Sequence, residues 1–134
     1  MKIALVQMDV VHGYPVENKK HVIEMLEKAL VANPDVIVLP EMWNTGYVLN
    51  ELDGLADKDG LDSQELLSHF ARKHAVAIIG GSVAIEKDGK FYNTTYVYNK
   101  SGDLINTYSK VLRMTPILSA TLAPPTMAAK GRTG

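Results

Sequence analysis

The stretch VIVLPEMWNTGY, residues 36–47, begins with four apolar residues, three of them β-branched. Such a run predicts a strand buried on both faces, as the inner strands of parallel sheets are. Pro40 ends the run, and the carboxylate of Glu41 follows it directly. Open α/β sheets form ligand crevices just past the carboxyl ends of their strands, so Glu41 is a candidate general base. The alternative is a solvent-exposed loop acid or a helix cap.

The segments before this stretch predict a parallel strand-helix-strand unit. Residues 2–8 form a short apolar run, which we expect to be a central or near-central strand. Apolar residues recur at helical spacing over residues 16–32, and the Asn-Pro pair at 33–34 ends that helix. The strand at 35–39 follows at once, and a connection of this size joins two parallel strands.

The later segments predict one more helix and then antiparallel strands. We expect a loop over residues 40–61 with a short helix near 50–56, then a helix over 62–74 that Asp62 caps. Strands are expected at residues 76–86, 91–99 and 103–108. The Asp-Gly pair at 88–89 is a two-residue hairpin signal, so the first two of these strands should be antiparallel. Together these elements predict an α/β fold with a mixed β-sheet.

The composition narrows the classes of function. The chain has 134 residues, of which 46% are hydrophobic and 22% charged, with a formal net charge of -1. These values give no reason to expect nucleic acid or a membrane as partner, and no apolar run is long enough to span a bilayer. No stretch resembles a signal peptide, so a cytoplasmic location and a small polar substrate are the expectations.

The chain contains no cysteine, which excludes disulfides, thiolate metal sites and a cysteine nucleophile supplied by this sequence. The four histidines lack metal-binding spacing, and the acidic segment DKDGLD at 57–62 lacks the closing glutamate of a calcium loop. Gly-Gly-Ser at 80–82 matches no catalytic motif and indicates tight backbone packing. No metal and no cofactor are therefore expected.

Lys110 is the second candidate catalytic residue. It follows the last expected strand in the stretch NTYSK, where a lysine side chain can reach the same crevice as Glu41 and stabilise an oxyanion. The alternative is an ordinary surface lysine, which is the commoner situation for any single lysine.

The order of these features resembles the nitrilase or carbon-nitrogen hydrolase superfamily. The resemblance rests on Glu41 within LPEMWNTGY, the hairpin strand FYNTTYVYNKSG and the later YSK with Lys110, and it covers residues 1 to about 111. It implies an α-β-β-α sandwich, of which this chain would be the N-terminal half, and a Glu-Lys-Cys triad that hydrolyses small amides or nitriles. In that triad Glu41 would be the general base and Lys110 the oxyanion stabiliser. The resemblance also implies homo-oligomers.

The sequence departs from the family pattern directly after Lys110. The family's cysteine has no counterpart here, and Leu104 to Gly134 contain no acidic residue. We therefore expect a hydrolase domain part at 1–111 and a divergent, irregular tail at 112–134, caused by a frameshift or a premature end. The expected fragment exposes sheet surface that favours association or aggregation.

Three functions fit this sequence. The first is an omega-amidase-like hydrolase chain, related to enzymes acting on small ω-amides of 2-oxo acids, that is inactive as given because it lacks the thiol. The second is a non-catalytic binding or regulatory fragment that pairs with a complete hydrolase subunit. The third, an unrelated flavodoxin-like ligand domain, predicts a continuing parallel pattern that the 88–89 hairpin contradicts.

Overall fold

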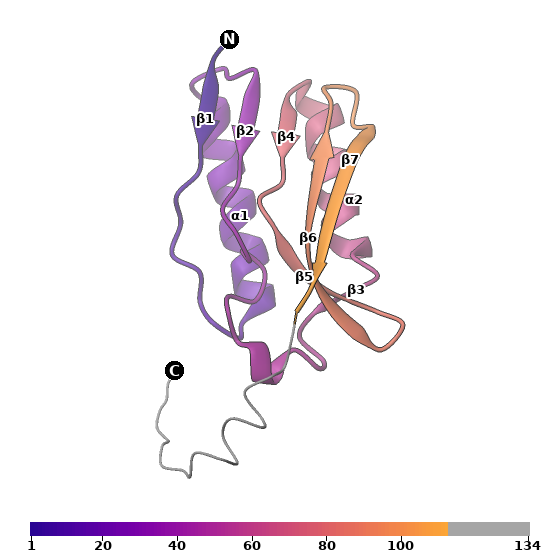
Figure 1. Cartoon of the computed structure of the whole chain (residues 1–134). Helices are drawn as coiled ribbons and strands as arrows, with labels where there is room; N and C mark the ends of the chain where they lie inside the picture. The colour runs from indigo at the N-terminus through magenta and orange to yellow at the C-terminus, as the bar shows by residue number, and fades with distance from the viewer. Residues whose placement is uncertain (113–134) are drawn as a thin grey trace.

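The computed structural model describes residues 1–112, which form one mixed β-sheet with two helices (Figure 1). The helices are α1 (Pro15–Leu30) and α2 (Leu61–His74), and a short 3-10 turn, η1, spans Leu49–Glu51. The strands are β1 (Ile3–Leu5), β2 (Val36–Val38), β3 (Asp57–Lys58), β4 (Ala77–Ile79), β5 (Val83–Lys87), β6 (Lys90–Tyr98) and β7 (Leu104–Val111). The expected tail falls on residues 113–134, outside the described part, except for Leu112.

The sheet has the strand order β1-β2-β4-β6-β5-β3, with β7 paired to β6 as well. The strands β1, β2 and β4 are parallel, and β6 is antiparallel to β4, β5 and β7. The prediction of a mixed sheet is confirmed. The expectation that the first strand is central was wrong: within residues 1–112, β1 pairs with β2 alone and lies at the edge of the sheet.

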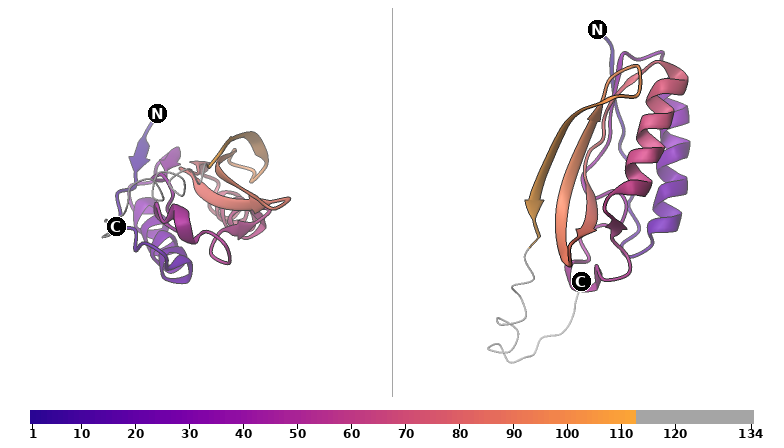
Figure 2. Two further views of the ribbon diagram at one scale, coloured as in Figure 1. Left: turned by 60° about the horizontal axis from the view of Figure 1, so that its bottom comes forward. Right: turned by 90° about the vertical axis from the view of Figure 1, so that its right-hand side faces the viewer.

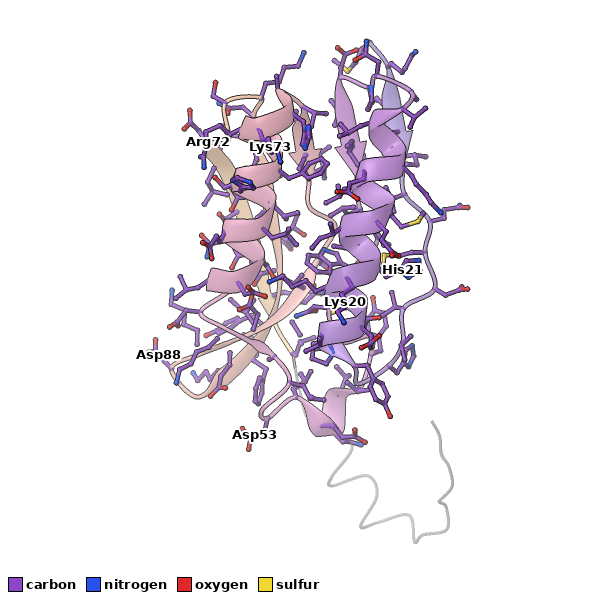
Figure 3. All side chains as sticks on the ribbon, turned by 180° about the vertical axis from the view of Figure 1, so that it is seen from behind. Lys20, His21, Asp53, Arg72, Lys73 and Asp88 are labelled. Carbon is purple, nitrogen blue, oxygen red and sulfur yellow. The ribbon has the colours of Figure 1, made fainter. Side chains whose placement is uncertain are left out.

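Both helices cover the same face of the sheet, as the right-hand view of Figure 2 shows. On this face Ile37 and Ile78 are fully buried against the apolar stripes of α1 and α2, including Leu26 and Leu67. The outer surface of the helices carries charged side chains such as Lys20, Arg72 and Lys73 (Figure 3). No helix within residues 1–112 has the length and hydropathy to cross a bilayer.

The opposite face of the sheet has no helix on it. Leu5 of β1 is 72% exposed, Ile79 of β4 is 40% exposed and Tyr108 of β7 is 68% exposed. Val36 and Val38 of β2 point to this face and are only half-buried. The expectation that β2 is buried on both faces was therefore wrong for the described residues, because a second covering layer is needed to bury a sheet on both sides.

The N-terminus of α2 is capped by Asp57, a residue of β3 that lies before the helix. The residue before the helix is Gly60, with φ of 66°, and the carboxylate of Asp57 accepts hydrogen bonds from the backbone N–H groups of Asp62, at 3.2 Å, and Ser63, at 2.7 Å. The expectation that Asp62 is the cap was wrong. Its side chain instead forms an exposed ion pair with Lys19 of α1 at 2.8 Å.

The single strand expected at 76–86 is split into β4 and β5 by residues 80–82. Gly81 has φ of +61°, and a Cβ atom on it would lie 2.0 Å from the carbonyl oxygen of Pro40. Tight backbone packing at the Gly-Gly-Ser segment is thus confirmed. The hairpin at Asp88 and Gly89 is also confirmed, with positive φ values of 52° and 77°.

Candidate active site

Glu41 follows β2, where the chain is hydrogen-bonded to the segment between β4 and β5: the Pro40 carbonyl oxygen accepts the Ser82 N–H at 3.2 Å. The backbone after it is fixed by Ser82, whose Oγ accepts the Met42 N–H at 2.9 Å and whose carbonyl oxygen accepts the Trp43 N–H at 3.1 Å. The indole Nε1 of Trp43 donates to the carbonyl oxygen of Gly80 at 3.0 Å. Met42 is fully buried and has φ of 50°, a strained value for a residue with a side chain. These contacts hold the Glu41 backbone in place.

The side chain of Asn44 makes two hydrogen bonds to the main chain of β5, as a neighbouring strand would. Its Nδ2 donates to the carbonyl oxygen of Ala84 in β5, and its Oδ1 accepts the Ala84 N–H, both at 2.9 Å. The Asn44 carbonyl oxygen in turn accepts a hydrogen bond at 2.8 Å from Nδ2 of Asn18, a fully buried residue of α1. Two buried carboxamides therefore connect α1, the loop after Glu41, and β5.

The carboxylate of Glu41 is exposed and has one neighbour that orients it. The hydroxyl group of Tyr47 donates to Glu41 Oε1 at 2.5 Å. This hydrogen bond raises the pKa of Tyr47 to about 12, with burial and the charge of Glu41 adding to the effect. The second carboxylate oxygen of Glu41 remains open for proton transfer.

Lys110 lies near the end of β7. It belongs to a row of paired residues that crosses the sheet to Ala84, the residue that Asn44 binds. Lys110 pairs with Asn93 of β6, and Asn93 pairs with Ala84 of β5. Directly paired residues project to the same face. Their neighbour Thr94 projects into the helix-side cavity described below, so Lys110 projects to the face without helices. Strands are about 5 Å apart, which puts the Lys110 backbone roughly 10 Å from Ala84.

Lys110 is thus linked through the Asn93 and Ala84 pairing to Asn44, three residues after Glu41, but no hydrogen bond or ion pair within residues 1–112 joins Glu41 to Lys110. The ion pairs within the described residues connect Lys19 to Asp62 and Lys100 to Asp35. Both Glu41 and Lys110 are exposed. A carboxylate and an ammonium that are each exposed have the chemistry for proton transfer and for oxyanion stabilisation.

Asn18, together with Gln7, matches the family's first helix and strand in the opening KIALVQMDVVHGYPVENKKHV. Sequence reasoning missed the other residues that hold this region together, which are Asn44, Tyr47 and Ser82. Two of them lie within the family-like stretch LPEMWNTGY, but their spacing carried no sign of which group each would bind. No three His, Asp or Glu side chains within residues 1–112 gather closely enough for a metal ion.

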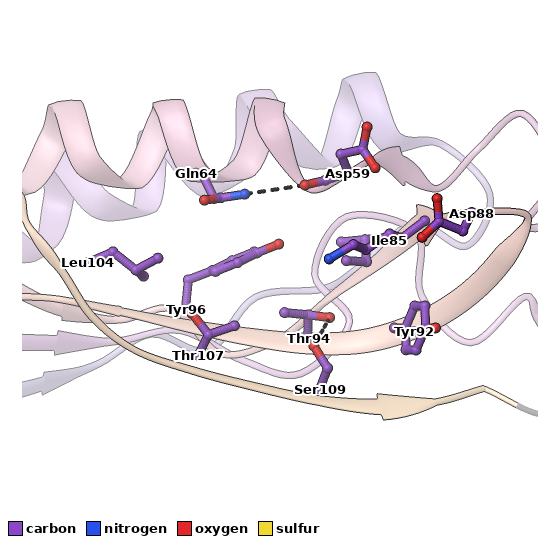
Figure 4. A pocket seen from close by; sticks show the side chains of 11 residues that line it. Asp59, Gln64, Ile85, Asp88, Tyr92, Thr94, Tyr96, Leu104, Thr107 and Ser109 are labelled. Carbon is purple, nitrogen blue, oxygen red and sulfur yellow. Dashed lines mark hydrogen bonds between the residues drawn. The ribbon is translucent and has the colours of Figure 1, made fainter.

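A cavity of about 550 Å³ lies on the other side of the sheet, between α2 and strands β6 and β7 (Figure 4). Thr94 and Ser109 line it and share a hydrogen bond of 2.8 Å between their hydroxyl groups, and Gln64 reaches it from α2. Neither Glu41 nor Lys110 lines this cavity. It is therefore separate from the candidate active site.

Comparison with known proteins decides the family. The model of the family described as carbon-nitrogen hydrolase matches residues 2–127. The chain belongs to the carbon-nitrogen hydrolase family. The match extends beyond Val111, where the sequence pattern was expected to end, and the division into 1–111 and 112–134 stays a prediction.

Two curated members of this family illustrate the similarity. The 2-oxoglutaramate amidase of Bacillus subtilis (strain 168) is 45% identical over 108 residues, which are 81% of this chain and 41% of that protein. The "Hydrolase in agr operon" of Staphylococcus aureus is 40% identical over 118 residues, which are 88% of this chain and 45% of that protein. The chain therefore spans less than half the length of these relatives.

A solved structure gives the same answer for the fold. Saccharomyces cerevisiae Nit3, a member of branch 10 of the nitrilase superfamily, superposes with a TM-score of 0.72 and 26% identity, over 82% of this chain and 44% of that one. The predicted fold class, the N-terminal half of a nitrilase-type fold with a mixed sheet, is confirmed.

Proposed function

We propose that this chain contributes the general base, Glu41, and the oxyanion-stabilising cation, Lys110, of a hydrolase acting on small ω-amides of 2-oxo acids. The observation that supports this proposal is that Asn44, three residues after Glu41, binds Ala84, which lies in the same row of paired residues as Lys110. The substrate class rests on the similarity to the 2-oxoglutaramate amidase. Nitriles are the alternative substrates that the family resemblance implies.

The reaction proposed for the family needs a general base and a cation that stabilises an oxyanion. The free oxygen of Glu41 takes the proton of a thiol, whose sulfur then forms a bond to the amide carbon. The ammonium of Lys110 stabilises the oxyanion of the tetrahedral intermediate. Glu41 returns the proton to the nitrogen, ammonia leaves as the C–N bond breaks, and water hydrolyses the thioester.

This chain supplies no thiol, because none of its 134 residues is cysteine. A carboxylate such as Glu41 is too weak a nucleophile to replace it in amide cleavage at neutral pH. We therefore expect the chain on its own to be inactive. The frameshift as the cause of the missing thiol stays a prediction, as do the cytoplasmic location and the homo-oligomer.

The test is ammonia release from a panel of small ω-amides, with the purified chain and its Glu41→Gln variant. Equal background rates for both proteins are the expected result. Ammonia release by the chain that Glu41→Gln abolishes would overturn the proposal that the chain is catalytically incomplete.

A second candidate function is a regulatory fragment that pairs with a complete hydrolase subunit. It is favoured by the exposed apolar side chains of Leu5, Ile79 and Tyr108 on the face without helices. Association with a cysteine-containing member of the family, measured by light scattering of the mixed proteins, would support it. If the chain stays a monodisperse monomer in the presence of that subunit, this candidate function is excluded.

A further inference from the structure

Among the side chains of residues 1–112, one buried polar atom has no hydrogen-bond partner. The side-chain Oδ1 of Asn93 in β6 lacks any hydrogen-bond donor, although Asn93 is only 8% exposed. An unpaired acceptor in such a position is costly because it loses its hydrogen bonds to water, so native proteins rarely leave one without a reason.

The residue directly opposite carries the donors that Asn93 lacks. Asn93 and Lys110 are register partners on adjacent antiparallel strands, so their side chains leave the sheet on the same face. The main-chain groups of Ala84 bond to Asn44, away from β6, which makes Ala84 and Asn93 a non-hydrogen-bonded pair. Asn93 and Lys110 are then a hydrogen-bonded pair, about 5.5 Å apart at Cα, within the span of a lysine side chain.

The remaining polar neighbours do not compete strongly. Ala84, on the other side of Asn93, has an apolar side chain, and Thr95 and Tyr108 on the same face each bring a single hydroxyl group. Neither these hydroxyl groups nor the Lys110 ammonium bonds to Oδ1 in the structure. A lysine ammonium has three donors and a flexible stem.

We propose that Asn93 is a positioning residue for Lys110: its buried Oδ1 accepts a hydrogen bond from the Lys110 ammonium and holds it over β6, on the face of the sheet without helices. The proposal builds on the catalytic role proposed for Lys110. The exposed Lys110 side chain folds back over β6, which satisfies the buried oxygen and leaves two ammonium protons for an oxyanion. A fixed ammonium stabilises developing charge without reorganising during the reaction.

With this contact, a second charged group near the site would have a fixed orientation. Tyr47 already orients one oxygen of Glu41, and Asn93 would orient the cation in the same way. Asn44 binds Ala84, the residue of β5 that pairs with Asn93.

The test measures the Lys110 ammonium directly in the ¹⁵N-labelled chain by NMR, which needs no activity. The signal is assigned by its loss in Lys110→Arg, and Lys87 and Lys90 of the exposed hairpin are internal references. We expect the Lys110 ammonium protons to exchange about tenfold more slowly than those references, which corresponds to about 1.4 kcal/mol for a hydrogen bond to a charged group. Asn93→Ala should abolish the difference, and Asn93→Asp, which keeps an acceptor, should retain it.

The matched control is Asn106→Ala, because Asn106 lies on β7, on the same face, opposite Val97. This variant should leave the Lys110 signal unchanged. If the Lys110 ammonium of the unmodified chain exchanges as fast as those of Lys87 and Lys90, the proposal is overturned, whether or not Asn93→Ala folds. Slow exchange that persists in folded Asn93→Ala would also overturn it. Neither result would affect the proposed role of Glu41, and neither affects the expected inactivity of the chain, which the ammonia assay tests separately.

Discussion

Replacing Asn44 by alanine should destabilise the whole domain, although the residue lies in a loop. The side chain satisfies both main-chain groups of Ala84, which is fully buried. Alanine at position 44 leaves that N–H and that C=O unpaired, and each unpaired buried group costs about 1–3 kcal/mol. Some water will enter the space left by the carboxamide, so we expect a loss of about 2–4 kcal/mol in the free energy of unfolding.

This loss is large compared with the total stability of such a domain, which is about 5–15 kcal/mol. At about 4–8 °C per kcal/mol for small domains, the melting temperature should fall by roughly 10–25 °C. Asn44→Asp should be at least as harmful, because a carboxylate can accept the Ala84 N–H but places a second oxygen against the Ala84 carbonyl.

The assay is urea unfolding followed by tryptophan fluorescence. The sequence has one tryptophan, Trp43, which is 2% exposed and adjacent to Asn44, so its emission reports on this loop. Circular dichroism at helical wavelengths, dominated by α1 and α2, reports on the rest of the fold. Coincident transitions would show that the loop and the sheet unfold together.

The control is Asn50→Ala, because Asn50 is an exposed asparagine in the same loop. It should change the free energy of unfolding by less than about 0.5 kcal/mol. A loss for Asn44→Ala no larger than that of the control, with an unchanged m value, would refute the reasoning that this carboxamide replaces a strand.

Three further predictions concern the surroundings of Glu41. Gly81→Ala should prevent normal folding or lower the urea midpoint sharply, because its Cβ would lie 2.0 Å from the Pro40 carbonyl oxygen; a midpoint equal to that of the parent chain would contradict the packing described. Ser82→Ala should cost about 1–3 kcal/mol of unfolding free energy in the same measurement, since it removes the acceptor of a buried N–H. The pKa of Tyr47, raised from 10.0 to about 12, favours the folded state below pH 10, and this contribution is lost as the pH rises through 12. Ultraviolet titration should therefore show late-ionising phenols, one of which is lost in Tyr47→Phe and ionises nearer pH 10 in Glu41→Gln. Tyr98, whose pKa burial raises to about 12, should stay late-ionising in both variants. No change in Glu41→Gln would rule out the carboxylate as the cause.

Local chemistry explains what could be predicted. The apolar run before Glu41, the helical periods of α1 and α2, and the Asp88-Gly89 turn are each encoded within a few residues, and each element formed close to its expected bounds. The motif around Glu41 and the later Lys110 also indicated the family from residue types and their order alone, and the family match confirmed it. Their catalytic roles stay predictions that the experiments above address.

The sequence by itself therefore determined the kinds of element, their order and the family, because those depend on neighbours along the chain. Only the tertiary structure decided that β1 lies at an edge, that Asp57 caps α2 and that Asn44 completes the sheet beside β5. The Asn44 contact joins residues 40 positions apart, and its energy depends on which buried groups would otherwise be unpaired. The side chains that hold Glu41 in place thus became visible only when distant segments were brought together.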